Sequence, residues 1–339
     1  MGLVHTDSFN LYASTADLTN NYTNAGNWTW SASAGRNGDG AIVGGTGGQT
    51  GLLSRPAIWP ANTVQLGVGL WFKCAAHVSA AKNYLQLLNA AGTSQGTLGL
   101  STSGFVTIGD VNGVVRATGT TDVCDGAFHW LEFYWDIRNT QTLKAYADTV
   151  QQFSGTFSAS TAGTSAEKYQ WLSNNSQQIT ISYPIFFDAN APSPQISAIP
   201  LGPRQVTYQL MSNDSSVQFV PNTGSTNFTQ IDEISADGDT SYVQSATSGQ
   251  VDLYGIAGLS FTPATINAIQ VVARVKNPGP GTINHKVRCS SNAVTSDTAS
   301  TVTPSSYQNT QLYVNQDPNT SAAWTPGNLT NAKFGVTVV

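Results

Sequence analysis

The strongest structural signal lies between Asp125 and Ile137, where the chain reads Asp-Gly-Ala-Phe-His-Trp-Leu-Glu-Phe-Tyr-Trp-Asp-Ile. An Asp-Gly turn signal is followed by aromatic and branched apolar residues, a composition typical of a β-strand. Side chains alternate across a strand, so this segment has one apolar face and one face that mixes rings with carboxylates. The apolar face consists of His129, Leu131, Phe133, Trp135 and Ile137, and the mixed face of Phe128, Trp130, Glu132, Tyr134 and Asp136. We predict a central strand with its apolar face in the core.

Alternating apolar residues predict further strands on both sides of this segment. Upstream, Val64, Leu66, Val68, Leu70 and Phe72 alternate with Gln, Gly and Trp, which is the period of a strand. Shorter runs bounded by turn residues predict strands at 84–88, 96–100, 105–108, 114–117, 143–147 and 179–187. A turn or two of helix is expected only at residues 165–172. Repeated short strands without long helices predict a sandwich or jelly roll.

Four prolines fall within residues 191–203, and this density predicts a semi-rigid linker. The linker would separate a first domain, residues 1–190, from a second domain, residues 204–339. Strands of the second domain are expected at 205–210, 227–231, 241–244, 268–276, 284–289, 311–314 and 334–339. Two of them, 268–276 and 284–289, flank the turn sequence Asn-Pro-Gly-Pro-Gly and predict a hairpin. The predicted fold is therefore all-β, a jelly-roll sandwich followed by a smaller β-sandwich.

The composition of the chain excludes several classes of protein. Because 40% of the residues are hydrophobic, the chain is not of the disordered class, which combines low hydrophobicity with high net charge. A net charge of −5 with only 14 Lys and Arg argues against nucleic acid as a partner. No apolar run approaches the roughly 18 residues of a membrane helix. Charged residues are only 10% of the chain, so Ser, Thr, Asn, Gln and Gly must form much of the surface, as in many extracellular and viral β proteins.

The sequence also lacks motifs for metals, cofactors and nucleophiles. Its three cysteines, Cys74, Cys124 and Cys289, have no CxxC spacing and are expected to be free buried thiols. The four histidines show no HExxH pattern, and His129 is expected to be a core histidine with its hydrogen bonds satisfied. No Gly-x-Ser-x-Gly motif occurs. We expect no cofactor and no catalytic residue.

Residues 5–190 resemble the concanavalin A-like lectin/glucanase (laminin-G-like) jelly roll. The resemblance rests on Asp-Ser-Phe at 7–9, on the strand at 66–72, on the Asp-x-x-x-His-Trp pattern that begins at Asp125, and on the closing strand at 179–188. It implies a sandwich of two sheets. The glucanase branch carries a Glu-x-Asp-x-Glu type cluster on one strand. Here no second Glu follows Asp136, so the resemblance implies the fold without the hydrolytic site.

The mixed face of the central strand is the best candidate for a ligand site. Trp130 and Tyr134 offer flat apolar rings that stack on sugars, and Glu132 and Asp136 offer oxygens that accept hydrogen bonds from hydroxyl groups. These four residues are the glycan-binding candidates. The alternative is that a loop or the second domain covers this face. Glycoside hydrolysis usually requires two carboxylates that face one bond, and the chain has only three Glu, so we do not expect an enzyme.

Two clusters in the second half have weaker signals. Asp237 and Asp239, with Asp232 and Asp252 nearby, form an Asp-Gly-Asp turn that offers oxygen ligands for calcium, although Asx-turns explain it without a metal. The predicted hairpin would place four basic residues on one face of a sheet. These partner-docking candidates are Arg274, Lys276, Lys286 and Arg288, and they would bind an acidic protein surface or simply be solvated.

Most of residues 203–339 resemble a β domain of tailed-bacteriophage virion proteins. The resemblance is carried by Ile-Asp-Glu-Ile-Ser-Ala-Asp-Gly-Asp-Thr-Ser-Tyr-Val at 231–243, Asp-Leu-Tyr at 252–254, Asn-Gln-Asp-Pro-Asn-Thr-Ser-Ala-Ala-Trp-Thr at 315–325 and Lys-Phe-Gly-Val-Thr-Val at 333–338. It implies a non-enzymatic structural protein of the virion, either a tail or fibre component or a head-decoration protein. Such a protein would assemble with itself, with a trimer favoured, and dock to other virion proteins. The alternatives are an adsorption protein that binds host glycans and a glycan depolymerase.

Overall fold

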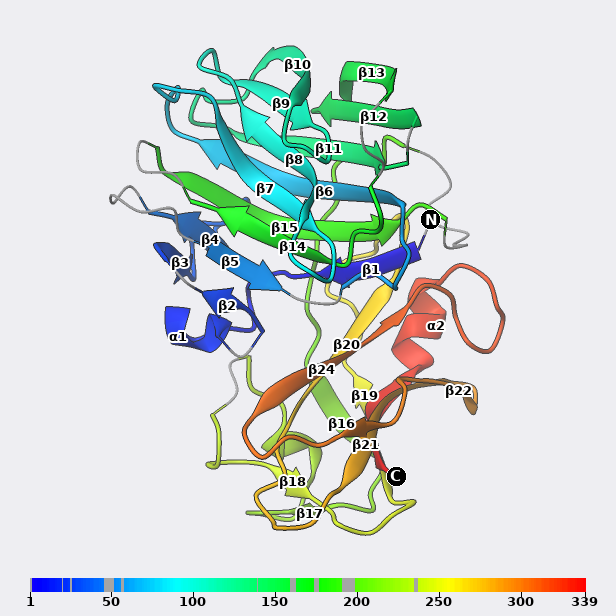
Figure 1. Ribbon diagram of the computed structural model, residues 1–339. Coiled ribbons are helices and arrows are strands. Elements are labelled where there is room, and N and C mark those ends of the chain that lie inside the picture. The colour runs from blue at the N-terminus through cyan, green and yellow to red at the C-terminus, as the bar shows by residue number, and fades with distance from the viewer. Residues whose placement is uncertain are drawn as a thin grey trace. The chain divides into compact units, whose positions relative to one another are not determined.

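The computed structural model describes the chain in two compact units (Figure 1). Among the described residues, those up to Val206 form unit 1 and those from Thr207 onward form unit 2. The described residues are 2–19, 21–24, 26–45, 52–55, 58–138, 140–158, 163–173, 177–190, 199–234 and 237–339. Of the expected linker, residues 191–198 lie outside this set, and residues 199–203 belong to unit 1. No helix among the described residues is long and apolar enough to cross a membrane.

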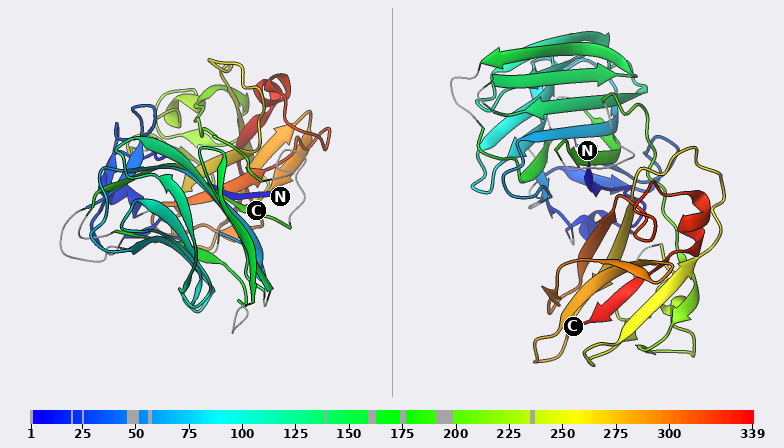
Figure 2. Two further views of the ribbon diagram at one scale, coloured as in Figure 1. Left: turned by 90° about the horizontal axis from the view of Figure 1, so that it is seen from above. Right: turned by 90° about the vertical axis from the view of Figure 1, so that its right-hand side faces the viewer.

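Unit 1 is a sandwich of two antiparallel sheets, which Figures 1 and 2 show as separate layers. The first, called the β11 sheet, has the order β13 (Val150–Ser158), β12 (Thr140–Ala147), β11 (Phe128–Asp136), β6 (Gln65–Cys74), β15 (Ile179–Asp188), β4 (Ala41–Gly44) and β3 (Trp28–Ser31), with β1 (Gly2–Thr6) beside β15. The second, called the β7 sheet, has the order β10 (Val115–Asp122), β9 (Phe105–Gly109), β8 (Ser94–Leu100), β7 (Lys82–Leu88), β14 (Lys168–Leu172), β5 (Leu52–Arg55) and β2 (Thr23–Asn24). A short helix, α1 (Thr15–Leu18), precedes β2. The prediction of an all-β fold with a jelly-roll sandwich is confirmed.

Strand β11 lies inside its sheet, as its composition indicates. It pairs with β6 from Phe128 opposite Lys73 to Asp136 opposite Gln65, and with β12 on its other side. The predicted alternation of its side chains is also observed. Leu131, Phe133, Trp135 and Ile137 belong to the apolar cluster between the two sheets, while the side chains that alternate with them, those of the mixed face, point to the outside of the β11 sheet.

The outer face of the β11 sheet carries a second apolar layer. Glycines in β6 make room for it: a Cβ at Gly67 would lie 1.9 Å from the ring of Phe187, and a Cβ at Gly69 would lie 2.7 Å from the ring of Trp130. Phe187 and Trp130 are fully buried but do not belong to the cluster between the sheets. The Gly residues that alternate with the core positions of β6 are therefore a packing requirement for large rings on the outer face.

Unit 2 is a smaller β-sandwich (Figure 1). Its larger sheet has the order β16 (Met211–Ser216), β19 (Val251–Ile256), β25 (Lys333–Val338), β21 (Asn284–Ser291) and β22 (Val294–Asp297), with β23 (Thr301–Val302) beside β21. Its smaller sheets are β20 (Ile269–Val275) with β24 (Gln308–Val314), and β17 (Val220–Pro221) with β18 (Val243–Gln244). The helices are η1 (Phe228–Gln230) and α2 (Pro326–Asn331). Val271 of β20, Leu312 of β24 and Val287 of β21 share one core, so β20 and β24 pack on the larger sheet.

Several local predictions are wrong, each for a visible reason. Residues 165–172 contain strand β14, because Tyr169 and Trp171 alternate into the core. Residues 227–231 form the short helix η1. The expected hairpin does not form. Instead β20 pairs with β24, and β21 pairs with β25, β22 and β23, so the turn after β20 connects two sheets.

Candidate functional site

The carboxylate of Glu132 is covered by the chain segment that precedes unit 2. This segment, residues 199–206, is called the strap and belongs to unit 1. The backbone N–H of Leu201 donates to Oε1 at 2.5 Å, and the N–H of Gly202 donates to Oε2 at 2.7 Å. The indole Nε1–H of Trp130 also donates to Oε2, at 2.9 Å. Glu132 is 0% exposed, so its carboxylate oxygens contact these protein donors and not solvent.

Two tryptophans beside Glu132 complete the attachment of the strap. Trp130 and Trp71 pack edge to face, with ring centroids 5.6 Å apart. The Nε1–H of Trp71 donates to the carbonyl oxygen of Arg204 at 2.9 Å, and the guanidinium of Arg36 lies 4.6 Å from the centre of the Trp71 ring. Trp130 is 0% exposed. Of the four glycan-binding candidates, Trp130 and Glu132 therefore do not reach solvent, and the alternative of a covered face describes this half of the site.

Burial raises the pKa of Glu132 above its ordinary value. The hydrogen bonds from Leu201, Trp130 and Gly202 and the charge of Arg204 act in the opposite direction, but removal of the carboxylate from water outweighs them. A buried carboxylate with three N–H donors is a structural anchor, because its oxygens are not available to a substrate.

The other two candidates, Tyr134 and Asp136, lie toward the end of β11, where Tyr134 is partly exposed and Asp136 is buried. The ring of Tyr134 is half-buried, and the ammonium of Lys144 lies 5.7 Å from its centre. Asp136 accepts hydrogen bonds from Gln65 Nε2 at 2.7 Å and from Arg138 Nε at 2.8 Å. These five residues, Gln65, Tyr134, Asp136, Arg138 and Lys144, are called the tyrosine patch.

The electrostatics of the tyrosine patch follow from these contacts. Desolvation alone would raise the pKa of Asp136, but the hydrogen bonds and charge of Arg138 and the amide of Gln65 hold it below its ordinary value. Desolvation raises the pKa of Tyr134, so its hydroxyl stays protonated at neutral pH. Arg138 is exposed and Lys144 is half-buried. The patch therefore combines a neutral ring with one cation over its face, Lys144, and a second cation, Arg138, that a carboxylate holds in place.

His129 lies at the opposite end of β11 and is not the core histidine that the alternation suggests. Its Nδ1 lies 2.6 Å from Asp148 Oδ2, and its Nε2 lies 3.0 Å from Asp125 Oδ1. Its side chain is 12% exposed. Burial alone would lower the pKa of His129, but the two aspartates outweigh it and raise the pKa above the ordinary value. The residue is an ion-paired clamp between the turn before β11 and the turn after β12.

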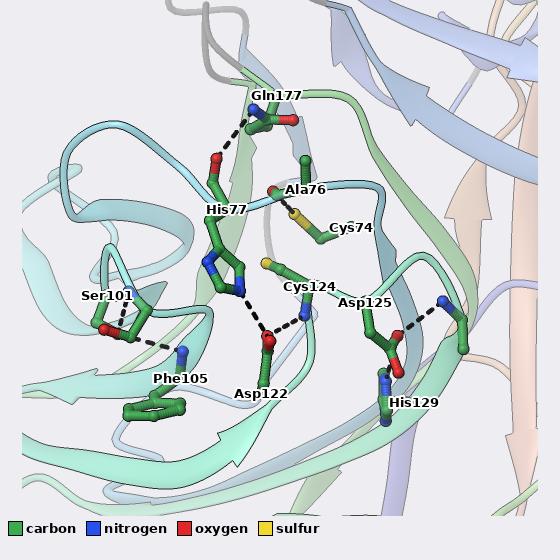
Figure 3. Close-up of polar contacts among 12 residues, drawn as sticks. Cys74, Ala76, His77, Ser101, Phe105, Asp122, Cys124, Asp125, His129 and Gln177 are labelled. Carbon is green, nitrogen blue, oxygen red and sulfur yellow. Dashed lines mark hydrogen bonds and ion pairs between the residues drawn. The ribbon is translucent and has the colours of Figure 1, made fainter.

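A second polar cluster lies where β6 and β10 end (Figure 3). His77 Nε2 lies 2.8 Å from Asp122 Oδ2, and the other oxygen of Asp122 accepts the backbone N–H of Cys124 at 2.8 Å. The thiol of Cys74 donates to the carbonyl oxygen of Ala76 at 3.0 Å. Sequence reasoning missed this cluster because its members are about fifty positions apart in the chain and follow no known spacing. All three cysteines of the chain are free and buried, as expected.

The four basic docking candidates of unit 2 do not share one face. Arg274 lies in β20 and Lys276 directly follows it, and both cations lie over the ring of Tyr307, at 5.4 and 4.4 Å from its centre. Lys286 and Arg288 lie on β21, in the other sheet, where Arg288 forms a two-pronged pair with Asp297 at 2.8 and 2.7 Å. The expectation of a single basic stripe is wrong, because it depended on a hairpin that does not form.

The aspartates considered for calcium bind protein donors. Asp239 pairs with Lys276 and accepts the hydroxyl of Tyr307 at 2.8 Å. Asp252 is buried and accepts the N–H groups of Gln218 and Phe219 at 2.6 and 2.7 Å, together with the side chains of Asn227 and Tyr254. Asp237 accepts the hydroxyl of Ser241. Within the described residues no group of three or more His, Cys, Asp or Glu is arranged to hold a metal ion.

Comparisons with known proteins were made at the levels of family, sequence and structure. No family model matches the chain, and no curated protein matches it. Solved structures similar to it include the cellulose-induced protein Cip1, with 10% identity, 55% of this chain and 97% of that chain covered, and a TM-score of 0.42. The carbohydrate recognition domain of Emp46p has 12% identity, coverages of 55% and 96%, and a TM-score of 0.39. Domain 4 of the arabinanase AbnA from Geobacillus stearothermophilus has 17% identity, coverages of 55% and 92%, and a TM-score of 0.37.

Proposed function

We propose that unit 1 is a glycan-binding module and that the tyrosine patch is its sugar site. The observation that supports this proposal most is the half-exposed ring of Tyr134 between charged hydrogen-bonding groups on a rigid, central strand. The apolar face of a pyranose ring stacks on an aromatic ring, and its hydroxyl groups require hydrogen-bond partners at the edge of that ring. The ammonium of Lys144, which lies over one face of the Tyr134 ring at 5.7 Å from its centre, and the guanidinium of Arg138, which Asp136 holds, are the donors that the patch offers.

The charges of the patch favour an acidic sugar. Lys144 and Arg138 are cations, and Asp136 is the single carboxylate among the five residues. Asp136 already accepts two hydrogen bonds from Arg138 and one from Gln65, so its role is to hold the guanidinium in place. A planar guanidinium fixed in this way is suited to bind the carboxylate of a uronic or sialic acid.

The proposed role is binding without turnover. Glu132 accepts three N–H groups and is fully buried, and Asp136 is paired with Arg138. Neither arrangement leaves a carboxylate free to act as a general acid beside a second carboxylate, which glycoside hydrolysis usually requires. We therefore propose that the protein is not an enzyme.

The test is binding of the whole protein to a glycan array that includes neutral and acidic sugars. Tyr134→Ala should abolish binding, and Tyr134→Phe should retain most of it, because the ring is kept. Tyr208→Ala is a matched control, since Tyr208 is also a partly exposed tyrosine but lies in unit 2. Binding that survives Tyr134→Ala, or no binding to any glycan, would contradict the proposal.

A role in a phage virion is the second candidate, and it concerns unit 2. It is supported by the sequence resemblance and by apolar side chains that unit 2 exposes, including Val220 and Val302 at 60% each and Phe261 at 44%. Association of copies through such residues would remove apolar surface from water. Light scattering tests this candidate. A stable trimer would favour it, and a monomer at all concentrations would remove its physical basis.

A further inference from the structure

The two cysteines of unit 1 meet at a crossing between its sheets. Cys74 is the last residue of β6, and Cys124 lies in the short connection between β10 and β11. The backbone N–H of Gly126 donates to the carbonyl oxygen of Cys74 at 3.0 Å, which fixes this connection against the end of β6. The two thiols are close enough for each to shift the pKa of the other, with the pKa of Cys74 lowered and that of Cys124 raised. Figure 3 shows the two sulfur atoms side by side.

We propose that Cys74 and Cys124 are a redox pair that closes to a disulfide in an oxidising environment. The pair differs from isolated buried cysteines because a hydrogen bond to the backbone of each cysteine holds that residue in place. The backbone N–H of Cys124 donates to Asp122 Oδ1 and fixes one partner, and the N–H of Gly126, which donates to the carbonyl oxygen of Cys74, fixes the other. Contact between sulfur atoms on fixed backbones is the condition for forming a disulfide without rearranging the fold.

The environment of the pair makes Cys74 the attacking sulfur. The hydrogen bond from the Cys124 thiol holds the pKa of Cys74 below its ordinary value, and the charge of His77 acts in the same direction. His77 is half-exposed, and its ring is held by Asp122 at 2.8 Å. The pKa of Cys124 is raised by the same contact and by burial. The thiolate is the nucleophile in disulfide exchange.

The oxidant required is a small disulfide such as oxidised glutathione. The Cys74 thiolate attacks one sulfur of that disulfide, the S–S bond breaks, and one glutathione thiolate leaves. Cys124 then loses its proton and attacks the Cys74 sulfur of the mixed disulfide, which releases the second glutathione. In total two protein thiols are oxidised by two electrons, and one glutathione disulfide is reduced to two thiols. Both sulfurs are buried, so the exchange should be slow and should depend on opening of the exposed residues 75–77.

The disulfide would join the two ends of the chain segment that contains β7, β8, β9 and β10. These strands form one half of the β7 sheet. A cross-link that closes a loop of about fifty residues restricts the unfolded chain and raises the stability of the folded one. The melting temperature of unit 1 should therefore rise on oxidation by on the order of 10 °C.

The test is incubation of the whole folded protein with oxidised glutathione, followed by a thiol count after denaturation and by peptide mapping without reductant. The count should fall from three thiols to one, the map should show a Cys74–Cys124 peptide, and reduction should reverse both changes. The melting temperature should rise in the wild type and in Cys289→Ser, but not in Cys124→Ser or Cys74→Ser. Cys289→Ser is the matched control, because Cys289 is a buried thiol of unit 2. A count that stays at three, a map with only glutathione adducts, or an unchanged melting temperature would overturn the proposal.

Discussion

The carboxylate of Glu132 and the backbone of Leu201, 69 positions apart in the chain, are joined by a hydrogen bond of 2.5 Å. With the bonds from Gly202 and Trp130 it makes Glu132 the anchor of the strap. The residue that sequence reasoning assigned to a ligand is therefore occupied by the protein's own backbone. This contact leaves the tyrosine patch as the part of the mixed face that solvent can reach.

Replacing this anchor should destabilise unit 1. In Glu132→Gln only one oxygen remains, so either the N–H of Leu201 or the pair of N–H groups of Gly202 and Trp130 loses its acceptor. The expected cost is about 2–3 kcal/mol in the free energy of unfolding, measured by urea denaturation. Glu167→Gln is the control, since Glu167 is half-buried and its carboxylate accepts, among the hydrogen bonds described, only from the hydroxyl of Ser165. Equal stability of the two variants would contradict the role of the anchor.

Gly67 should not tolerate a side chain. A Cβ there would lie 1.9 Å from the ring of Phe187, and Phe187 is fully buried. We expect Gly67→Ala to lower the free energy of unfolding by about 1–3 kcal/mol through overpacking. Gly258→Ala is the matched control, because a Cβ at Gly258 has nothing within 4 Å. A stable Gly67→Ala variant would show that the outer face is more loosely packed than described.

The His129 clamp should make the stability of unit 1 fall at alkaline pH. Because the pKa of His129 is raised above 6.5 in the folded protein, its pairing with Asp125 and Asp148 contributes fully below pH 6.5. The contribution is lost as the pH rises through the folded pKa. The difference in unfolding free energy between wild type and His129→Gln should be about 1 kcal/mol at pH 5.5 and should shrink by pH 9. A difference that grows with pH would contradict the clamp.

His285 in unit 2 should have the opposite pH dependence. Its ring is buried between the hydroxyls of Thr303 and Thr310, at 2.9 and 2.7 Å, and burial lowers its pKa below 6.5. The contribution of neutral His285 to the free energy of unfolding should therefore be complete above pH 6.5, and it should be lost as the pH falls below that value. Denaturation of wild type and His285→Gln between pH 4.5 and 7.5 measures this effect. If the wild type and His285→Gln lose the same unfolding free energy on acidification, protonation of His285 is not the cause of that loss.

Strand β11 could be predicted because its signal is local. The alternation of Leu131, Phe133 and Trp135 with polar and aromatic residues fixes the core face before any partner strand is known. The neighbouring strand β6 was predictable for the same reason. The apolar layer on the outer face could not be predicted. The glycines at 67 and 69 leave room for large side chains, but the sequence does not identify Phe187 and Trp130 as the rings that fill it.

The predictions that failed depend on contacts between segments that are distant in the sequence. No pattern within β11 indicates that Leu201 and Gly202 would bind Glu132. The turn after β20 has the composition of a hairpin turn, yet β20 pairs with β24 and not with β21. The prediction that the four basic residues share one face was wrong for this reason. The Cys74–Cys124 contact is likewise formed by two segments that the fold brings together.

The glycan-binding account is tested most directly by the affinity of the whole protein for acidic oligosaccharides, measured by calorimetry. The account predicts saturable binding to an oligosaccharide with uronic or sialic acid. Tyr134→Ala should weaken this binding at least tenfold, and Tyr134→Phe and Tyr208→Ala should leave it within about twofold of the wild type, since a lost stacking contact and its edge hydrogen bonds are worth at least 1.4 kcal/mol. Unchanged affinity in Tyr134→Ala, or no heat with any oligosaccharide, would contradict it.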